Sequence, residues 1–268
     1  MVARLRHVST RLLPHGPLDV VWQLALFAGA YYGYRFVRGA IDGQAAAAFQ
    51  NAREIISIER SLHLFVEPSV QAWATSRDAV ISFASWMYMN SHFTMAIATL
   101  VFIYLFRNSS FYFVRNMFMV AMGLALVGYL VFPTAPPRML PEWGFTDSVS
   151  SFTGIPQDSV TVNALFNPFA AVPSMHVGFS LMLGGSMARL VKPVPLKVAW
   201  ALYPLVVSFV VIATGNHYWL DALLGALTAV TAYGAATMMA RLRPARWSFR
   251  PTAAGAPARA PLGDAATA

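Results

Sequence analysis

Long runs of apolar residues dominate the chain, and shorter polar segments separate them. A helix that crosses a bilayer needs roughly 20 mostly apolar residues. Six stretches have about that length and character: residues 19–39, 78–106, 111–132, 174–190, 197–215 and 218–240. The pattern predicts an all-α, polytopic membrane protein with six transmembrane helices. The first stretch follows a basic start, as a cleaved signal peptide would, but its apolar run continues to Val37 and favours a retained helix.

The polar segments between these stretches differ in composition. Residues 40–77 mix charged and apolar positions in a pattern typical of amphipathic helix at a membrane surface, where we expect them to form an interfacial cap. Residues 133–173 hold seven prolines and predict a long outer loop, and loops of this length usually have a function. Residues 242–268 carry almost no large apolar residue past Phe249 and predict a disordered tail.

Charge is distributed unevenly between the two sets of polar segments. Thirteen of the 19 Lys and Arg fall in residues 1–18, in the two connections near 107–115 and 189–197, and in 241–268. Most Asp and Glu fall in the segments between them. Because cytoplasmic segments of membrane proteins carry the excess of Lys and Arg, both termini are predicted to be cytoplasmic. We therefore expect an integral protein of the plasma membrane, with a basic N-terminal segment over 1–18 and a transmembrane domain over 19–241.

Composition supports this class and excludes others. The chain is 57% hydrophobic and 11% charged, too apolar for an ordinary soluble enzyme, a disordered chain or a coiled coil. The net charge of +8 comes from residues scattered between apolar runs, so we expect membrane orientation and no nucleic-acid partner. The absence of cysteine excludes disulfides, thiolate metal sites and cysteine nucleophiles.

Few ionisable residues lie within or beside the predicted spans, and each is a functional candidate because burying it there is costly. Arg138 follows the third span, His176 opens the fourth, and His217 and Asp221 open the sixth. In the predicted topology all four positions lie near the outer interface. The sequence therefore predicts one polar site that faces the outside of the membrane.

His217 and Asp221 are four residues apart in a helical run, which places them on one face of the helix. A carboxylate at that spacing can hold one imidazole nitrogen as N–H and leave the other free to act as a nucleophile or base. The alternative is that Asp221 only neutralises a buried histidine.

The other candidates also have ordinary structural interpretations. Ser174 is placed to cap the helix that carries His176, and Arg138 suits a headgroup anchor at the interface. Tyr88 and His92, one turn apart in the second span, are typical of hydrogen bonds between membrane helices.

Taken together, these motifs resemble those of a known family. The segment Pro173-Ser174-Met175-His176, followed about 40 residues later by His217-Tyr218-Trp219-Leu220-Asp221, resembles the second and third signature motifs of the type 2 phosphatidic acid phosphatase (PAP2) superfamily. Ala135-Pro136-Pro137-Arg138, with Tyr88 and His92 upstream, looks like the branch that includes inositol phosphorylceramide synthase. The resemblance covers roughly residues 50–240.

The resemblance implies a role for each catalytic candidate. His217 would attack phosphorus, Asp221 would orient it, and His176 would protonate the leaving alkoxide. The chemistry is consistent, because an anionic phosphoryl centre favours a neutral nucleophile and an alkoxide leaves poorly without a proton. The positive ends of the helices at both motifs are expected to stabilise the phosphate as well.

The chain also departs from the family pattern. Val131 and Met139 stand where the first motif has its lysine and proline, and Val210 and Val211 stand where the third motif has Ser-Arg. Arg138 is the matched cation that remains. Candidates to replace the missing donors are Asn216, His92, Tyr88 and Arg60.

These observations predict an enzyme without metal or other cofactor. It would move a phosphoryl-headgroup from a phospholipid donor to an alcohol acceptor through a phosphohistidine. The alternative is a phosphatase acting on phosphatidic acid or a polyprenyl phosphate. A transporter is a more distant alternative, because the polar groups cluster at one depth instead of lining a path. The pattern makes no prediction about oligomeric state.

Overall fold

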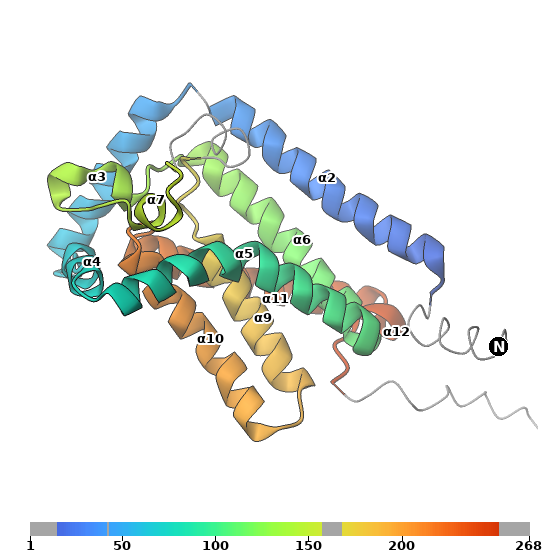
Figure 1. Cartoon of the computed structure of the whole chain (residues 1–268). Helices are drawn as coiled ribbons and strands as arrows, with labels where there is room; N and C mark the ends of the chain where they lie inside the picture. Colours follow the sequence, from blue (N-terminus) through green and yellow to red (C-terminus); the bar gives the residue numbers. More distant parts are fainter. Residues whose placement is uncertain (1–14, 42, 157–167, 252–268) are drawn as a thin grey trace, which may run out of the picture.

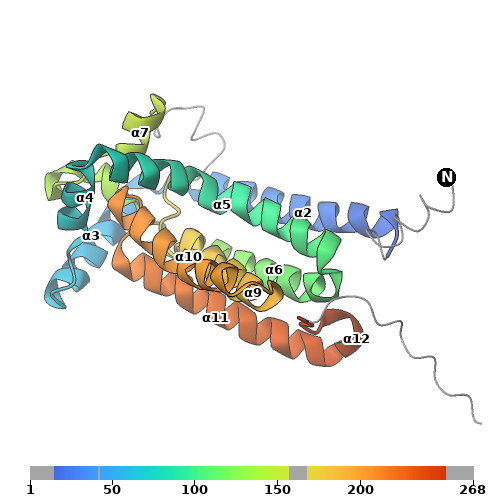
Figure 2. The same cartoon turned by 60° about the horizontal axis from the view of Figure 1, so that its bottom comes forward.

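The computed structural model describes residues 15–41, 43–156 and 168–251, and in these residues the chain is helical without a named strand (Figure 1). This confirms the all-α class. Six long helices coincide with the six apolar stretches: α2 (Pro17–Ile41), α5 (Asp78–Phe106), α6 (Asn108–Val131), α9 (Met175–Leu190), α10 (Val194–Ala213) and α11 (Trp219–Leu242). They pack lengthwise as a bundle (Figures 1 and 2).

The six long helices differ in whether they are long and apolar enough to cross a bilayer. Among the described residues, α6, α10 and α11 are long and apolar enough to span a membrane. A fourth span results if the two halves of α5, bent by 48° relative to each other, are counted as one. The 16 residues of α9 fall short of a full crossing, and α2 is not among the candidates either. The arrangement of six spans therefore stays a prediction.

Proline and polar residues mark the helix ends. Phe132-Pro133 follows α6, and α9 begins directly after Pro173 and Ser174. Proline lacks the backbone N–H that a helix interior needs, and it disfavours helical conformation in the residue before it. The long apolar runs are thus divided into separate helices close to the candidate site residues Arg138 and His176.

Two shorter helices, α3 (Ala45–Ser61) and α4 (Glu67–Thr75), lie at one end of the bundle. The 3-10 turns η1 (Pro137–Met139) and η2 (Pro141–Trp143) and the short helix α7 (Ser148–Thr153) are also found at this end (Figure 1). One face of α3 is buried, at positions three and four residues apart: Ala48, Ala52, Ile55, Ile56 and Glu59. Both helices fall within 40–77, and their position at a membrane surface remains a prediction.

A polar cluster ties the first and last described helices together at the opposite end. Asp19 of α2 accepts hydrogen bonds from Tyr104 of α5 (3.0 Å), Tyr112 of α6 (2.7 Å) and Gln23 (3.1 Å). Arg246 of α12 (Pro244–Trp247) adds an ion pair of 3.0 Å to the same carboxylate. We call these five residues the Asp19 cluster.

The Asp19 cluster corrects one expectation. The composition predicts a disordered tail from residue 242, yet α12 packs against α6 and α11, and Arg246 reaches Asp19. Arg246 gives the buried Asp19 carboxylate a cationic partner, a contact that joins α12 to the bundle. Residues 252–268 lie outside the described part of the chain.

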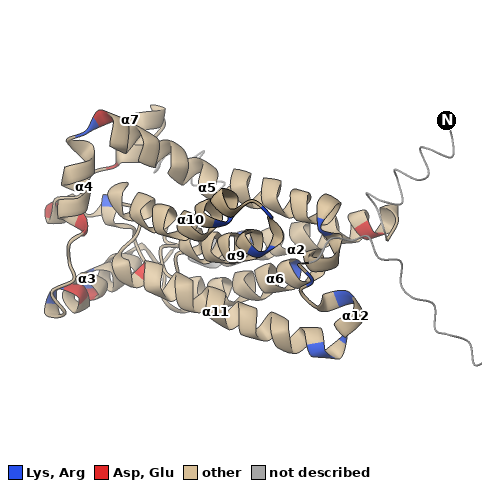
Figure 3. Cartoon of the chain, turned by 90° about the horizontal axis from the view of Figure 1, so that it is seen from below, with Lys and Arg blue, Asp and Glu red and all other residues tan. Residues whose placement is uncertain are grey.

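Charge follows the same division of the bundle into two ends. Lys and Arg concentrate near α12, the end of α11 and the α9–α10 connection, and Asp and Glu concentrate around α3 and α4 (Figure 3). This is the distribution that the sequence indicates for an inner and an outer face.

A close contact between α9 and α11 defines the centre of the site. A Cβ atom at Gly225 would collide with the backbone oxygen of Ser174, so only glycine allows this approach. The backbone N–H of Ser174 donates to the carbonyl oxygen of Asp221 at 3.0 Å. The helix starts that carry His176 and His217 are held side by side as a result.

Candidate active site

His217 lies in the tight connection between α10 and α11. Gly215 reverses the chain with a φ of +68°, and the N–H groups of Asn216 and His217 both donate to the carbonyl oxygen of Val211, at 3.0 and 3.1 Å. A positive φ favours glycine because it has no Cβ. A Cβ atom at this position would also lie 2.5 Å from Nε2 of Gln71, so that the buried Gln71 side chain would have to move. The turn thus fixes the backbone immediately before the imidazole.

Asp221 holds one nitrogen of the His217 ring. Its Oδ2 lies 3.3 Å from Nδ1 of His217 and also accepts the N–H of Tyr218 at 3.0 Å. Both side chains are buried, His217 with 5% and Asp221 with 0% of its surface exposed. Burial and the Arg138 guanidinium lower the pKa of His217, which precedes α11, to about 3. The ring is therefore neutral at physiological pH. Besides Asp221, the backbone of Ala171 forms a hydrogen bond with the ring.

His176 faces His217 from the first turn of α9. The two ring centroids are 5.6 Å apart, with the planes tilted by 60°. Tyr88 of α5 stacks on His176, at 4.5 Å between centroids and 17° between planes. The stack holds the ring of His176 in place beside the ring of His217.

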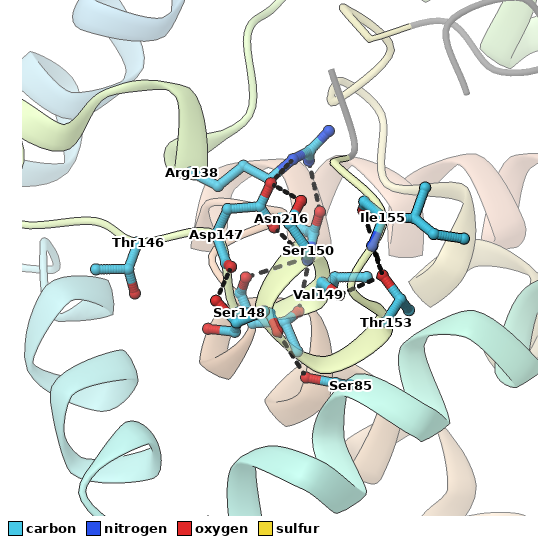
Figure 4. A network of polar contacts seen from close by, with 12 residues as sticks. Ser85, Arg138, Thr146, Asp147, Ser148, Val149, Ser150, Thr153, Ile155 and Asn216 are labelled. Atoms are coloured by element: carbon cyan, nitrogen blue, oxygen red, sulfur yellow. Dashed lines mark hydrogen bonds and ion pairs between the residues drawn. The ribbon is translucent and has the colours of Figure 1, made fainter. Parts of the chain in front are cut away.

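Arg138 brings positive charge to the site through a network that includes α7 (Figure 4). Its guanidinium donates to Oδ1 of Asn216 and lies 3.8 Å from Oδ2 of Asp147. Asp147 also caps α7 by accepting from the N–H (2.9 Å) and hydroxyl (2.6 Å) of Ser150. The Arg138 charge is thus partly balanced by a carboxylate.

The structure brings together most of the residues that the sequence singles out. His176, His217, Asp221, Arg138, Asn216 and Tyr88 are joined by the contacts above. Ser174 is fully buried beside them, and its hydroxyl has no hydrogen-bond partner within the described residues. The side chain of His92 lies outside the described part of the structure.

The structure places the residues that could replace the missing cations in different surroundings. Asn216 is a hydrogen-bond partner of Arg138. Arg60 lies over the ring of Trp143 at 5.4 Å and lines a separate hollow with Arg53, Ser57 and Ser61. Val211 is completely buried in a hydrophobic cluster, so this position supplies an apolar contact where the family pattern has a cation.

Two buried glutamates at the start of α11 are absent from the predicted set of site residues. Oε1 of Glu67 accepts the N–H of Trp219 at 3.0 Å, and Oε1 of Glu59 accepts the N–H of Leu220 at 2.8 Å. With Asp221 on Tyr218, three consecutive N–H groups each bind a different carboxylate. These three donors at the α11 terminus are therefore occupied by carboxylates, and stabilisation of a phosphate by the positive end of the helix stays a prediction.

The sequence does contain a signal for Glu59. It lies three and four residues after Ile56 and Ile55 and seven after Ala52, on the apolar face of α3. A carboxylate on a buried face indicates a specific partner, because burying it unpaired is costly. Glu67, in the first turn of α4, looks like an ordinary acidic residue at a helix start.

The fold and these contacts define an all-helical membrane protein with a site of two histidines and a carboxylate. A family model described as the PAP2 superfamily matches residues 53–235. Because the match covers more than half of the chain, the protein belongs to the PAP2 superfamily. Membership indicates a phosphatase or phosphotransferase of lipid phosphates. No curated protein matches the chain, and no solved structure does either.

Proposed function

We propose that the protein is a lipid phosphotransferase that moves a phosphoryl-headgroup from a phospholipid to an alcohol through a phosphohistidine on His217. The observation that carries this proposal is the arrangement of His217 between Asp221, 3.3 Å from Nδ1, and His176, 5.6 Å away between ring centroids. An oriented nucleophile with a proton donor opposite it is the minimal apparatus for displacement at phosphorus.

The proposed reaction has two displacements. Nε2 of His217 attacks phosphorus, the P–O bond to the lipid alcohol breaks, and protonated His176 gives its proton to the departing oxygen. The acceptor alcohol then attacks the phosphohistidine, His176 takes the hydroxyl proton, and the P–N bond breaks. His217 returns to its neutral form. The headgroup phosphate has then been exchanged between two alcohols, and both histidines have their starting protonation.

The charge balance of the site favours a phosphodiester as donor. A phosphate monoester carries nearly two negative charges at neutral pH, whereas a diester carries one. Arg138 is the cation that contacts the site, and Asp147 lies 3.8 Å from it. Asp221, 3.3 Å from Nδ1 of His217, adds an acidic group beside the nucleophile. A monoanion such as a phosphatidylinositol-like lipid matches these surroundings better than a dianion, as in the inositol phosphorylceramide synthase branch that the motifs resemble.

We further propose that this site faces the outside of the plasma membrane, with both chain ends in the cytoplasm. The concentration of Lys and Arg at the end of the bundle opposite α3 and α4 supports this orientation (Figure 3). The substrates would then be lipids of the outer leaflet.

Purified protein in lipid nanodiscs, offered two types of donor, tests the reaction. One donor is a phosphatidylinositol labelled in its headgroup phosphate, and the other is phosphatidic acid or a polyprenyl phosphate. Each is assayed with and without a long-chain alcohol acceptor. We expect headgroup transfer from the diester and an acid-labile label on His217. His217→Ala serves as the negative control.

Release of inorganic phosphate from the monoesters, without transfer from the diester, would overturn the transferase proposal and identify a phosphatase instead. A labelled histidine with either donor would still support the shared first displacement. Acid-stable labelling, or labelling that survives His217→Ala, would contradict the phosphohistidine itself.

A further inference from the structure

Glu59 and Glu67 are buried carboxyl groups for which the proposed reaction has no use. They are 2% and 0% exposed. Glu54, on the same helix as Glu59, is exposed and accepts from Gln50, as a surface glutamate ordinarily does. Burial of two acidic groups in one place is costly unless each finds specific partners or is neutral.

The partners that Glu59 and Glu67 do find are adjacent in the chain. They bind the N–H groups of Leu220 and Trp219, while the neighbouring N–H of Tyr218 is bound by Asp221, the partner of His217. The first helical turn after His217 is therefore held by two residues from α3 and α4, on segments that precede it by more than 150 positions. Any movement of these carboxyls displaces the backbone that places Asp221.

Each of the two carboxyls also has a buried oxygen without a donor from any other group. Oε2 of Glu59 and Oε2 of Glu67 find none within the described residues, and neither does Oδ1 of Asp221. The two glutamate side chains lie within hydrogen-bond range of each other, and such a bond needs a proton on one of them. The described part of the chain contains no group of three or more acidic or histidine side chains arranged to hold a metal ion. A proton shared by the two carboxyl groups would remove one of their two negative charges and supply the missing hydrogen bond.

The charged groups around Glu59 also favour its protonated form. The titratable groups that act on it are Glu67 from α4 and Asp221 from α11, both acidic. Arg53 pairs with Glu142, and Arg60 lies over Trp143, so the arginines of α3 are engaged elsewhere. Burial, with Glu67 and Asp221 nearby, raises the pKa of Glu59 to about 9.

We propose that Glu59 and Glu67 form a carboxyl pair that shares one proton and positions the start of α11, and with it the His217–Asp221 dyad. They are positioning residues, since they act on the reaction through the backbone of residues 218–220. The catalytic role of the dyad rests on the proposed function, but the shared proton does not. When the proton leaves, both glutamates are negatively charged. They then repel each other next to Asp221.

Thermal unfolding across pH tests the shared proton without any assay of activity. In the unfolded chain Glu59 titrates near 4.5, and in the folded chain near 9. The folded state thus binds one more proton between these values, and its stability falls as pH rises through this window. Glu59→Gln carries no titrating proton, so the decline in Tm from pH 5 to pH 9 should be smaller than in wild type. Glu54→Gln is the matched control and should follow wild type.

Headgroup transfer across pH tests the positioning role. Wild-type kcat/KM should fall about tenfold per pH unit above about 9, the limb of a single essential proton. Glu59→Gln keeps an acceptor for Leu220 and a donor for Glu67, so it should lose this limb. Glu59→Ala leaves the Leu220 N–H without its acceptor and should lower kcat roughly 10–100-fold. This is the range seen when a residue that only orients a functional group is removed.

The two readouts separate the possible failures. Equal Tm slopes in wild type and Glu59→Gln would overturn the shared proton, whatever the enzyme does. A normal Tm difference with an unchanged alkaline limb in Glu59→Gln would overturn the positioning role. Wild-type protein without transfer or hydrolysis would overturn the proposed function and leave the carboxyl pair to be judged by the unfolding data.

Discussion

Both ends of the bundle contain buried carboxylates, but the hydrogen bonds of these carboxylates differ. At the α12 end, both oxygens of Asp19 are bonded: Oδ1 to Gln23 and Arg246, and Oδ2 to Tyr104 and Tyr112. At the α3–α4 end, Glu59, Glu67 and Asp221 each keep one buried oxygen without a donor from any other group in the described part of the chain. Buried polar groups are usually satisfied, so an unsatisfied cluster is an energetic cost that needs a reason.

The family match divides the molecule in the same way. Residues 53–235 include every candidate catalytic residue and both buried glutamates, whereas Asp19 and Arg246 lie outside the match. We infer that the Asp19 cluster closes the bundle and that the carboxylates around α11 serve the chemistry. The following experiments contrast the two ends.

The largest effect is expected at His217 and its carboxylate. His217→Ala removes the nucleophile and should abolish both turnover and covalent labelling. Asp221→Asn leaves the nucleophile but weakens its orientation, and should lower kcat by about 10²–10⁴-fold. Turnover and acid-labile labelling of both variants, measured on protein of confirmed fold, check this order. Full labelling of His217→Ala would contradict it.

His176→Ala should have an effect that depends on the leaving group. A poor alkoxide needs a proton as it departs, whereas a nitrophenolate leaves well without one, so the loss in kcat should be about 10²–10⁴-fold with the alkoxide and far smaller with the nitrophenolate. The measurement compares the two donors on wild type and variant. Equal losses would show that His176 does not act as the acid.

Asp19→Ala should change stability and leave the chemistry intact. The variant removes the acceptor of two buried tyrosine hydroxyls and the partner of Arg246, which should cost about 3 kcal/mol of unfolding free energy. Its transfer rate per folded molecule should stay within about twofold of wild type. A loss of activity like that of Asp221→Asn, without loss of stability, would contradict the inference that the Asp19 cluster serves stability alone.

The smallest effect belongs to two cysteine variants that report orientation. The chain has no cysteine, and Ser151 in α7 and Lys192 between α9 and α10 are both accessible at the surface. Ser151→Cys should react with an impermeant maleimide on intact cells, and Lys192→Cys should react only after lysis, with activity unchanged in both. The reverse pattern would place the site on the cytoplasmic side.

The helices themselves are largely readable from the sequence. The predicted stretch 78–106 coincides with α5, and 174–190 differs from α9 by one residue. This works because long apolar runs have few alternatives to helix, and prolines such as Pro133 and Pro173 mark their ends. Short segments carry no such signal, and α12 escapes prediction because its order depends on the contact between Arg246 and Asp19.

The site is predictable to the extent that its residues sit on those helices. The spacing of His217 and Asp221 places them on one face, and helix order brings His176 to the same end. The pairing of Arg138 with Asp147 depends on how the loop folds, which periodicity does not encode. The same holds for Glu67, whose distinguishing feature is a tertiary contact with the N–H of Trp219.

The carboxylates that bind the N–H groups in the first turn of α11 limit how this fold can be simplified by design. A minimal scaffold built from the long apolar helices alone would omit α3 and α4 and leave the N–H groups of Trp219 and Leu220 without acceptors. Each buried donor left without an acceptor costs roughly 1–3 kcal/mol, and the cost falls on the turn next to His217. Grafting the two histidines onto another bundle should therefore require transplanting the glutamates as well.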